Sequence, residues 1–63
     1  MYKKFIGYKN FVVMDFDTES INVYTNVAYT TDTEDLLKYL GHDINNSSYM
    51  WCNKLNFKID EHI

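Results

Sequence analysis

Three acidic residues stand close together directly after a run of apolar residues. Asp15, Asp17 and Glu19 follow the segment Phe11-Val12-Val13-Met14. Carboxylate oxygens at this spacing are ligands that Mg²⁺ and Ca²⁺ accept. The pattern of a calcium-binding EF-hand loop is absent, however, and a short acidic stretch after a strand is typical of a solvated turn. The spacing therefore predicts an acidic turn and no metal site.

The chain also contains a thiol and two imidazoles that could form a thiolate–imidazole pair, Cys52, His42 and His62. No residue pattern of a cysteine enzyme surrounds Cys52, and three such groups fall short of the four ligands of a closed zinc site. His42 is expected beside the last carbonyls of a helix, where a cation is favoured. We therefore predict no catalytic residue, no metal ligand and no bound cofactor, and hence a protein that is not an enzyme.

A second acidic cluster, Asp32, Glu34 and Asp35, follows the clearest predicted strand, Ile21 to Tyr29. The two clusters are expected at the same end of the sheet, where they would form one acidic patch. Tyr24 falls on the polar face of that strand, and exposed tyrosines are favoured as anchors in protein interfaces. The residues that we expect to contact a partner are Asp15, Asp17, Glu19, Tyr24, Asp32, Glu34 and Asp35.

Size and charge restrict the classes of function. A chain of 63 residues makes one domain, 1–63, and its small core leaves little room for an enzyme pocket. The net charge is −3 with six lysines and no arginine, which argues against direct binding of nucleic acid. The longest apolar run is too short to span a membrane, one cysteine excludes an internal disulfide, and no signal peptide is visible. We expect a cytoplasmic protein with no membrane contact.

Strands are predicted where β-branched and aromatic residues gather or alternate with polar ones. The expected strands are Tyr2 to Gly7, Phe11 to Phe16, Ile21 to Tyr29 and Trp51 to Ile59. Tyr8-Lys9-Asn10 reads as a turn, Asp17 to Ser20 as a hairpin loop, and Asp43 to Ser48 as a polar loop. The strictest alternation lies in the third strand, which we expect to be half-buried and antiparallel.

One short helix is predicted between the third and fourth strands. Thr31 or Asp32 suits its N-cap, and Gly41 is a natural left-handed stop. Because a helix of about ten residues does not persist alone, it must pack on the sheet. The fold class is therefore α+β, a small antiparallel sheet of three or four strands in the order β-β-β-α-β, or β-β-α-β if the first strand does not form, with the helix on one face. The expected core is Phe5, Val13 or Val12 with Met14, Ile21, Val23, Val27, Leu36, Leu37, Leu40, Trp51, Leu55 and Phe57.

The composition indicates an AT-rich gene, because Phe, Tyr, Met, Ile, Asn and Lys make up about half of the chain while Gly, Ala, Arg and Pro are scarce. In size, charge and codon bias the chain resembles the small proteins with which bacteriophages inhibit host or defence enzymes, anti-CRISPR proteins included. This resemblance assigns no residue roles.

The leading hypothesis is a non-enzymatic phage- or plasmid-type inhibitor of a host or defence nucleic-acid enzyme. Its acidic patch and exposed tyrosines would cover a basic surface of that enzyme, and self-association as a homodimer is compatible with this role. Two alternatives stand beside it. One is a small dimeric accessory protein that touches nucleic acid through Lys3, Lys4, Lys9, Lys54 and Lys58; the other is a structural subunit whose sheet edges pair.

Overall fold

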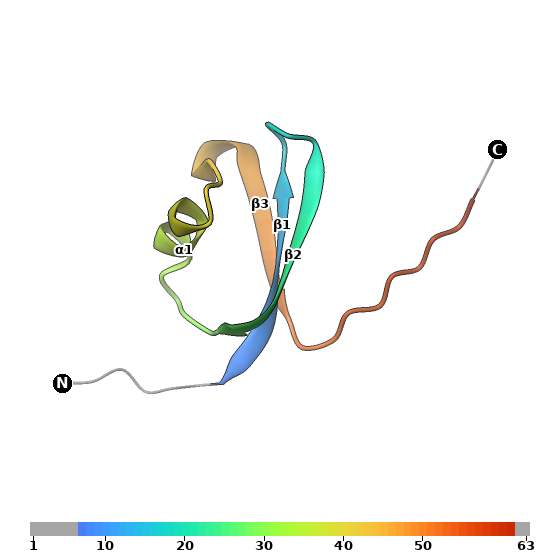
Figure 1. Cartoon of the computed structure of the whole chain (residues 1–63), viewed down its shortest axis with the longest axis horizontal. Helices are drawn as coiled ribbons and strands as arrows, with labels where there is room; N and C mark the ends of the chain where they lie inside the picture. Colours follow the sequence, from blue (N-terminus) through green and yellow to red (C-terminus); the bar gives the residue numbers. More distant parts are fainter. Residues whose placement is uncertain (1–6, 62–63) are drawn as a thin grey trace.

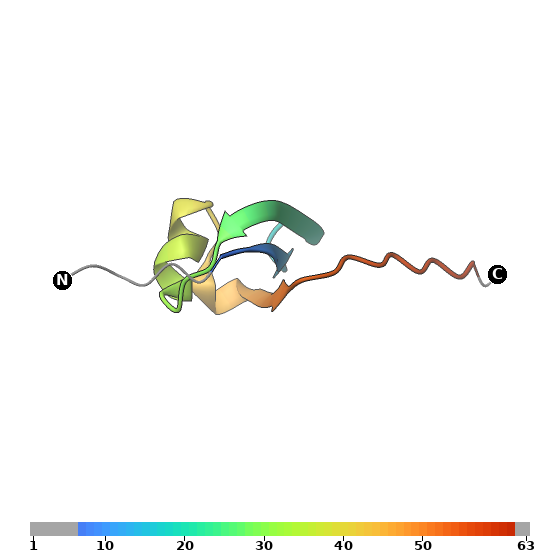
Figure 2. The ribbon, with the colours of Figure 1, turned by 90° about the horizontal axis from the view of Figure 1, so that it is seen from below.

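The computed structural model describes residues 7–61, and within them the chain forms a small α+β fold. The elements follow in the order β1 (Tyr8–Asp15), β2 (Ser20–Ala28), α1 (Thr33–Tyr39), the 3₁₀ turn η1 (Ile44–Asn46) and β3 (Ser47–Cys52). The strands form an antiparallel sheet in the order β2-β1-β3. Figures 1 and 2 show α1 on one side of this sheet, while the segment that follows β3 leads away on the other side. The predicted fold class is confirmed, while the predicted strand Tyr2 to Gly7 falls outside the described residues except for Gly7.

The first and last described strands differ from their predicted bounds. β1 begins at Tyr8, so the turn predicted over Tyr8-Lys9-Asn10 is wrong; these residues already pair with the end of β2. β3 begins at Ser47 and ends at Cys52, so the prediction of a strand from Trp51 to Ile59 is also wrong. The physical reason is that a strand forms only where a neighbouring strand can pair with it. β1 pairs with β3 only from Asn10 to Asp15, and residues beyond Cys52 have no neighbouring strand in the described chain.

A β-bulge in β2 reverses which of its residues face the helix. Lys9 pairs with Val27 and Phe11 with Tyr24, so two residues of β2 oppose one residue of β1. Asn26 in the bulge has φ 59, a conformation that asparagine tolerates better than most residues. Because of the extra residue, Tyr24 and Val27 both pack toward the core. The uniform alternation expected from Ile21 to Tyr29 is interrupted there.

The core lies between α1 and the face of the sheet that carries Phe11 and Val13. Both side chains are completely buried, and Leu37 from the helix is 2% exposed. Six further side chains pack around these three: Tyr24, Val27, Leu36, Leu40, Ile44 and Trp51. The predicted core is correct for the helix leucines, Val13, Val27 and Trp51. It misses Phe11 and wrongly includes Ile21 and Phe57, which are 69% and 70% exposed, and Val23, which stands beside Val12 on the face away from the helix. Of the two alternatives for the second predicted strand, Val13 is confirmed, and Val12 with Met14, which is 42% exposed, is wrong. Phe5 lies outside the described residues.

The helix ends as its sequence predicts. Gly41 has φ 88, its N–H donates to the carbonyl of Lys38, and the N–H of His42 donates to the carbonyl of Leu37. This pair of bonds is the Schellman motif, which satisfies the last helix carbonyls and turns the chain back toward the sheet. At the other end Asp32 takes the N-cap position without a capping bond from its side chain.

Candidate functional site

A chain of three polar side chains crosses the interior between the helix and the sheet. Nδ1 of His42 lies 2.7 Å from Oδ2 of Asp15, and Nε2 of His42 lies 2.7 Å from the hydroxyl of Tyr24. Asp15 is 6% and His42 8% exposed. The group therefore consists of a carboxylate, an imidazole and a hydroxyl in a row, two of them more than nine-tenths buried.

Each member of this polar chain is positioned by a local feature of the backbone. Asp15 is the last residue of β1 and points to the helix side, two positions after Val13. Tyr24 stands opposite Phe11 on the same face of the sheet, immediately before the bulge. The Schellman motif after α1 brings His42 over both. As a result, one imidazole links the end of the helix to two strands.

The second oxygen of the Asp15 carboxylate is occupied as well. Oδ1 accepts the backbone N–H of Asp17 at 3.0 Å and of Thr18 at 3.2 Å, which closes the turn between β1 and β2. The hydrogen bond from His42, followed by these backbone bonds, lowers the pKa of Asp15 below its ordinary value of 3.8, against the opposing effect of burial. An ionised carboxylate only accepts hydrogen bonds, so Nδ1 of His42 carries a proton.

The order carboxylate, imidazole and hydroxyl is the order in which a base activates a nucleophile in hydrolases. Here the hydrogen bonds of His42 join the end of α1 to β1 through Asp15 and to β2 through Tyr24, which is a structural role. The Tyr24 hydroxyl can donate to a neutral imidazole or accept from a protonated one, so the bonds persist in both states of His42. We conclude that the polar chain fastens the helix end to the sheet.

These contacts correct two of the expected partner-binding residues. Asp15 is not part of an exposed acidic patch, because it is buried and both its oxygens are bonded within the chain. Tyr24 is not on an exposed face, because that face is the one that α1 covers, and its hydroxyl is bonded to His42. The residue types of Asp15 and Tyr24 do not indicate that these side chains are covered. Their burial depends on which side of β1 and β2 the helix packs.

The remaining acidic residues stay exposed but form two separate groups. Asp17 and Glu19 lie in the turn that precedes β2, whereas Asp32, Glu34 and Asp35 lie at the start of α1, after the far end of β2. Figure 1 shows the turn at the top of the sheet and the helix beside its covered face. The expectation of one acidic patch from both clusters is therefore not met.

The face of the sheet opposite the helix carries an apolar surface that the described residues leave uncovered. The strand register places Val12 beside Val23 and Met50, and Met14 beside Ile21. Ile21 is 69% and Met50 59% exposed. We call this surface, formed by these five side chains, the open face. Contiguous exposed apolar surfaces of this kind mark sites of association in folded proteins.

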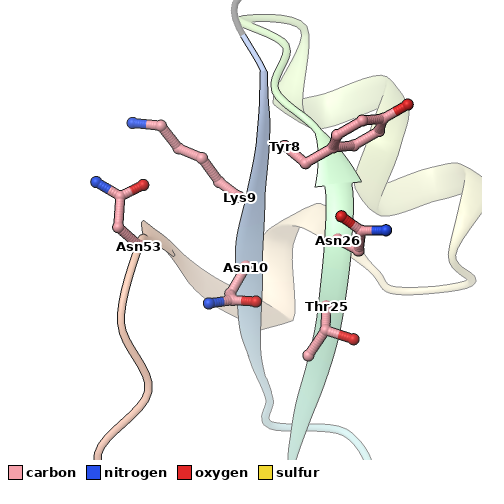
Figure 3. Close-up of a pocket in the computed structure, with 6 residues that line it drawn as sticks. All are labelled: Tyr8, Lys9, Asn10, Thr25, Asn26 and Asn53. Atoms are coloured by element: carbon pink, nitrogen blue, oxygen red, sulfur yellow. The ribbon is translucent and has the colours of Figure 1, made fainter.

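The two ends of the open face differ in chemistry. At the end near the β1–β2 turn, a hollow of about 160 Å³ is lined by Met14, Phe16, Glu19 and Ile21 together with Asp15 and Ser20. At the other end a larger hollow of about 260 Å³ lies at the bulge. Figure 3 shows its lining of amide, hydroxyl and amine groups from Tyr8, Lys9, Asn10, Thr25, Asn26 and Asn53. The open face is thus apolar in the middle, acidic at one end and amide-rich at the other.

Within residues 7–61, no group of three or more His, Cys, Asp or Glu side chains is arranged to hold a metal ion. His62 lies outside this range, and His42 is already bonded to Asp15 and Tyr24. None of the helices in the described part of the chain is long and apolar enough to cross a membrane. No family model, curated protein or solved structure matches the chain.

Proposed function

We propose that this chain is a non-enzymatic binding protein that docks on another protein with the open face of its sheet. The observation that carries the proposal is the exposure of Met14 beside Ile21, and of Met50 beside Val12, on a face that no described element covers. Burying such side chains in an interface releases ordered water from apolar surface, and methionine adapts well to the shape of a partner.

The acidic end of this face defines the chemistry of the partner. Glu19 lines the same hollow as Ile21, and Asp17 is exposed in the same turn. A partner that seats an apolar surface on the open face therefore gains from lysine or arginine side chains at this rim, by charge complementarity. Enzymes that bind nucleic acids carry such basic surfaces. We propose that the protein inhibits a host or defence enzyme of this class, in the cytoplasm of a bacterial cell, by covering its basic surface.

The first test measures binding to the partner after capture from a host lysate and purification of the captured protein. Ile21→Lys places a charge in the middle of the open face and is expected to weaken binding by at least tenfold, mainly through faster dissociation. Tyr39→Lys is the matched control, because Tyr39 is 87% exposed on the helix, away from the open face. Equal losses for the two variants, or no loss for Ile21→Lys, contradict the proposal.

The second test addresses the acidic rim. Neutralising Asp17 and Glu19 together is expected to slow association in low salt and to have little effect in high salt, because exposed charges steer encounters over a Debye length. Association that keeps its rate and its salt dependence in this variant shows that the rim is not part of the interface.

The nucleic-acid alternative predicts a different outcome. Two of its lysines already interact within the chain: Nζ of Lys9 lies 5.0 Å from the ring centre of Tyr29, and Nζ of Lys58 lies 3.9 Å from Oδ2 of Asp60. Purified protein is therefore expected to leave the electrophoretic mobility of DNA and RNA probes unchanged. A shift that falls steeply with salt favours the accessory-protein alternative.

A further inference from the structure

The segment that follows β3 has the sequence of a strand, but no strand formed by residues 7–61 lies beside it. Leu55, Phe57 and Ile59 alternate with Lys54, Asn56 and Lys58. Phe57 is 70% and Ile59 82% exposed, and Figures 1 and 2 show the segment leading away from the sheet after the bend at Asn53. We call residues 54–59 the arm. Its alternating pattern is that of a half-buried strand, which requires a neighbour on at least one side.

The outer edge of β3, which pairs with no other described strand and is called here its free edge, is suited to receive such a strand. β3 lies at one side of the sheet, and its pairing with β1 is regular over all six residues, whereas β2 at the other side contains the bulge. A bulge twists an edge and hinders further pairing, while a regular edge is a template for another strand. Tyr49 on β3 is 48% exposed, so apolar surface is available beside this edge.

We propose that two copies of the chain exchange their arms, so that the arm of each pairs antiparallel with the free edge of β3 of the other. The arm and β3 are equal in length, and Asn53 lies between them. A two-fold axis at Asn53 therefore aligns all of β3 with all of the partner copy's arm. This contact is isologous, as closed dimers require.

The side chains fit this register. Leu55 stands opposite Trp51 and Phe57 opposite Tyr49, so apolar and aromatic groups meet on the helix side of the sheet, and aromatic cross-strand pairs of this kind stabilise sheets. On the other side Lys54 stands opposite Cys52 and Lys58 opposite Ser48, so no like charges face each other directly. A shift by one residue would set the lysines against the aromatic groups.

Arm exchange covers the side chains of Phe57 and Ile59, which are 70% and 82% exposed, and it leaves the open face available to the partner proposed above.

The register is tested by disulfide trapping in the full chain, with Cys52→Ser as the background so that each variant holds one thiol. Asn53→Cys places two thiols across the two-fold axis, where strand spacing of about 5 Å permits a disulfide. Asn56→Cys is the matched control, because its symmetry mate lies roughly 20 Å away along the ladder. With oxidised glutathione, Asn53→Cys is expected to form covalent dimers and Asn56→Cys to stay monomeric. Equal cross-linking of both, or of neither, overturns the proposal.

Sedimentation of the unmodified protein supplies the second measurement. Wild type is expected at twice the 7.6 kDa of one chain, and Phe57→Asp as a folded monomer with the circular dichroism of the wild type. A wild-type monomer at millimolar concentration overturns the proposal, as does a dimer that survives Phe57→Asp. Loss of the dimer in Ile21→Lys but not in Phe57→Asp also overturns it, since it assigns self-association to the open face. If monomeric Phe57→Asp still binds the proposed partner, the proposed function stands even though the dimer is lost. The two proposals are therefore tested separately.

Discussion

The two faces of the sheet differ in a way that side-chain polarity alone would not predict, because polar groups are buried on one face and apolar groups are exposed on the other. The covered face buries a carboxylate and an imidazole, Asp15 and His42, beside Phe11 and Val13, whereas the open face leaves Ile21 and Met50 to solvent. The difference lies in what each group can bond to. Asp15 and His42 satisfy each other and their neighbours inside the molecule, so their burial is tolerated. The apolar groups of the open face have no such neighbours among residues 7–61, and we propose that a partner covers them.

The largest expected effect lies on the covered face. Among the described residues, the fully buried apolar core consists of Phe11, Val13 and Leu37, and Leu37 is its one member from α1. Leu37→Ala is therefore expected to lower the free energy of unfolding by about 2 to 5 kcal/mol. Tyr39→Ala, on the exposed side of the same helix, should lower it by less than about 0.5 kcal/mol. Urea denaturation of both variants measures the contrast. Equal stability of the two would remove the helix from the core.

A smaller effect is expected from the hydroxyl at the end of the polar chain. Tyr24→Phe removes the bond to Nε2 of His42 and keeps the ring in place, so it should cost about 1 kcal/mol. Tyr49→Phe is the control, because Tyr49 is half exposed. A Tyr24→Phe protein as stable as wild type in denaturant would show that this hydroxyl contributes nothing to fastening the helix.

Acid is expected to loosen the same connection. Because the hydrogen bond from His42 holds the pKa of Asp15 below 3.8, the folded state binds this proton less readily than the unfolded chain does. The stabilisation is therefore complete above pH 3.8 and is lost as the pH falls toward the lower pKa of the folded state. Unfolding followed across this range should show a shallower acid dependence for Asp15→Asn than for wild type. Identical slopes would contradict the lowered pKa.

The open face is expected to show the smallest effect on stability. Ile21→Lys should change the free energy of unfolding by less than about 0.5 kcal/mol, since Ile21 is 69% exposed. This is the counterpart of Leu37→Ala: one substitution damages the fold, and the other should damage only binding. Thermal and chemical denaturation measure the free energy of unfolding of both variants. A decrease for Ile21→Lys as large as that for Leu37→Ala would refute the comparison.

The sequence was sufficient for features that depend on neighbours in the chain. The stop at Gly41, the leucines of α1 and the existence of β2 follow from local patterns. What depends on contacts far along the chain was not predictable. The alternation from Ile21 onward has two faces, and nothing local says which one the helix covers; the bulge at Asn26 then exchanges them. For the same reason Asp15 and Tyr24 were expected at the surface.

The end of β3 illustrates the same limit. The pattern from Trp51 to Ile59 is that of a strand throughout, but a strand exists only where another strand pairs with it. In the described chain this support stops at Cys52, which pairs with Asn10. The part of the pattern beyond Cys52 is thus the arm.

The central claim is that α1 covers the Tyr24 face and leaves the Ile21 face open. Relaxation of side-chain protons by a dissolved paramagnetic agent, measured by nuclear magnetic resonance on the wild-type protein, tests it directly. The methyl groups of Ile21 and Met50 should relax strongly, and those of Val13 and Leu37 weakly. The opposite pattern, with Ile21 as protected as Leu37 and the Tyr24 ring fully exposed, would contradict the claim.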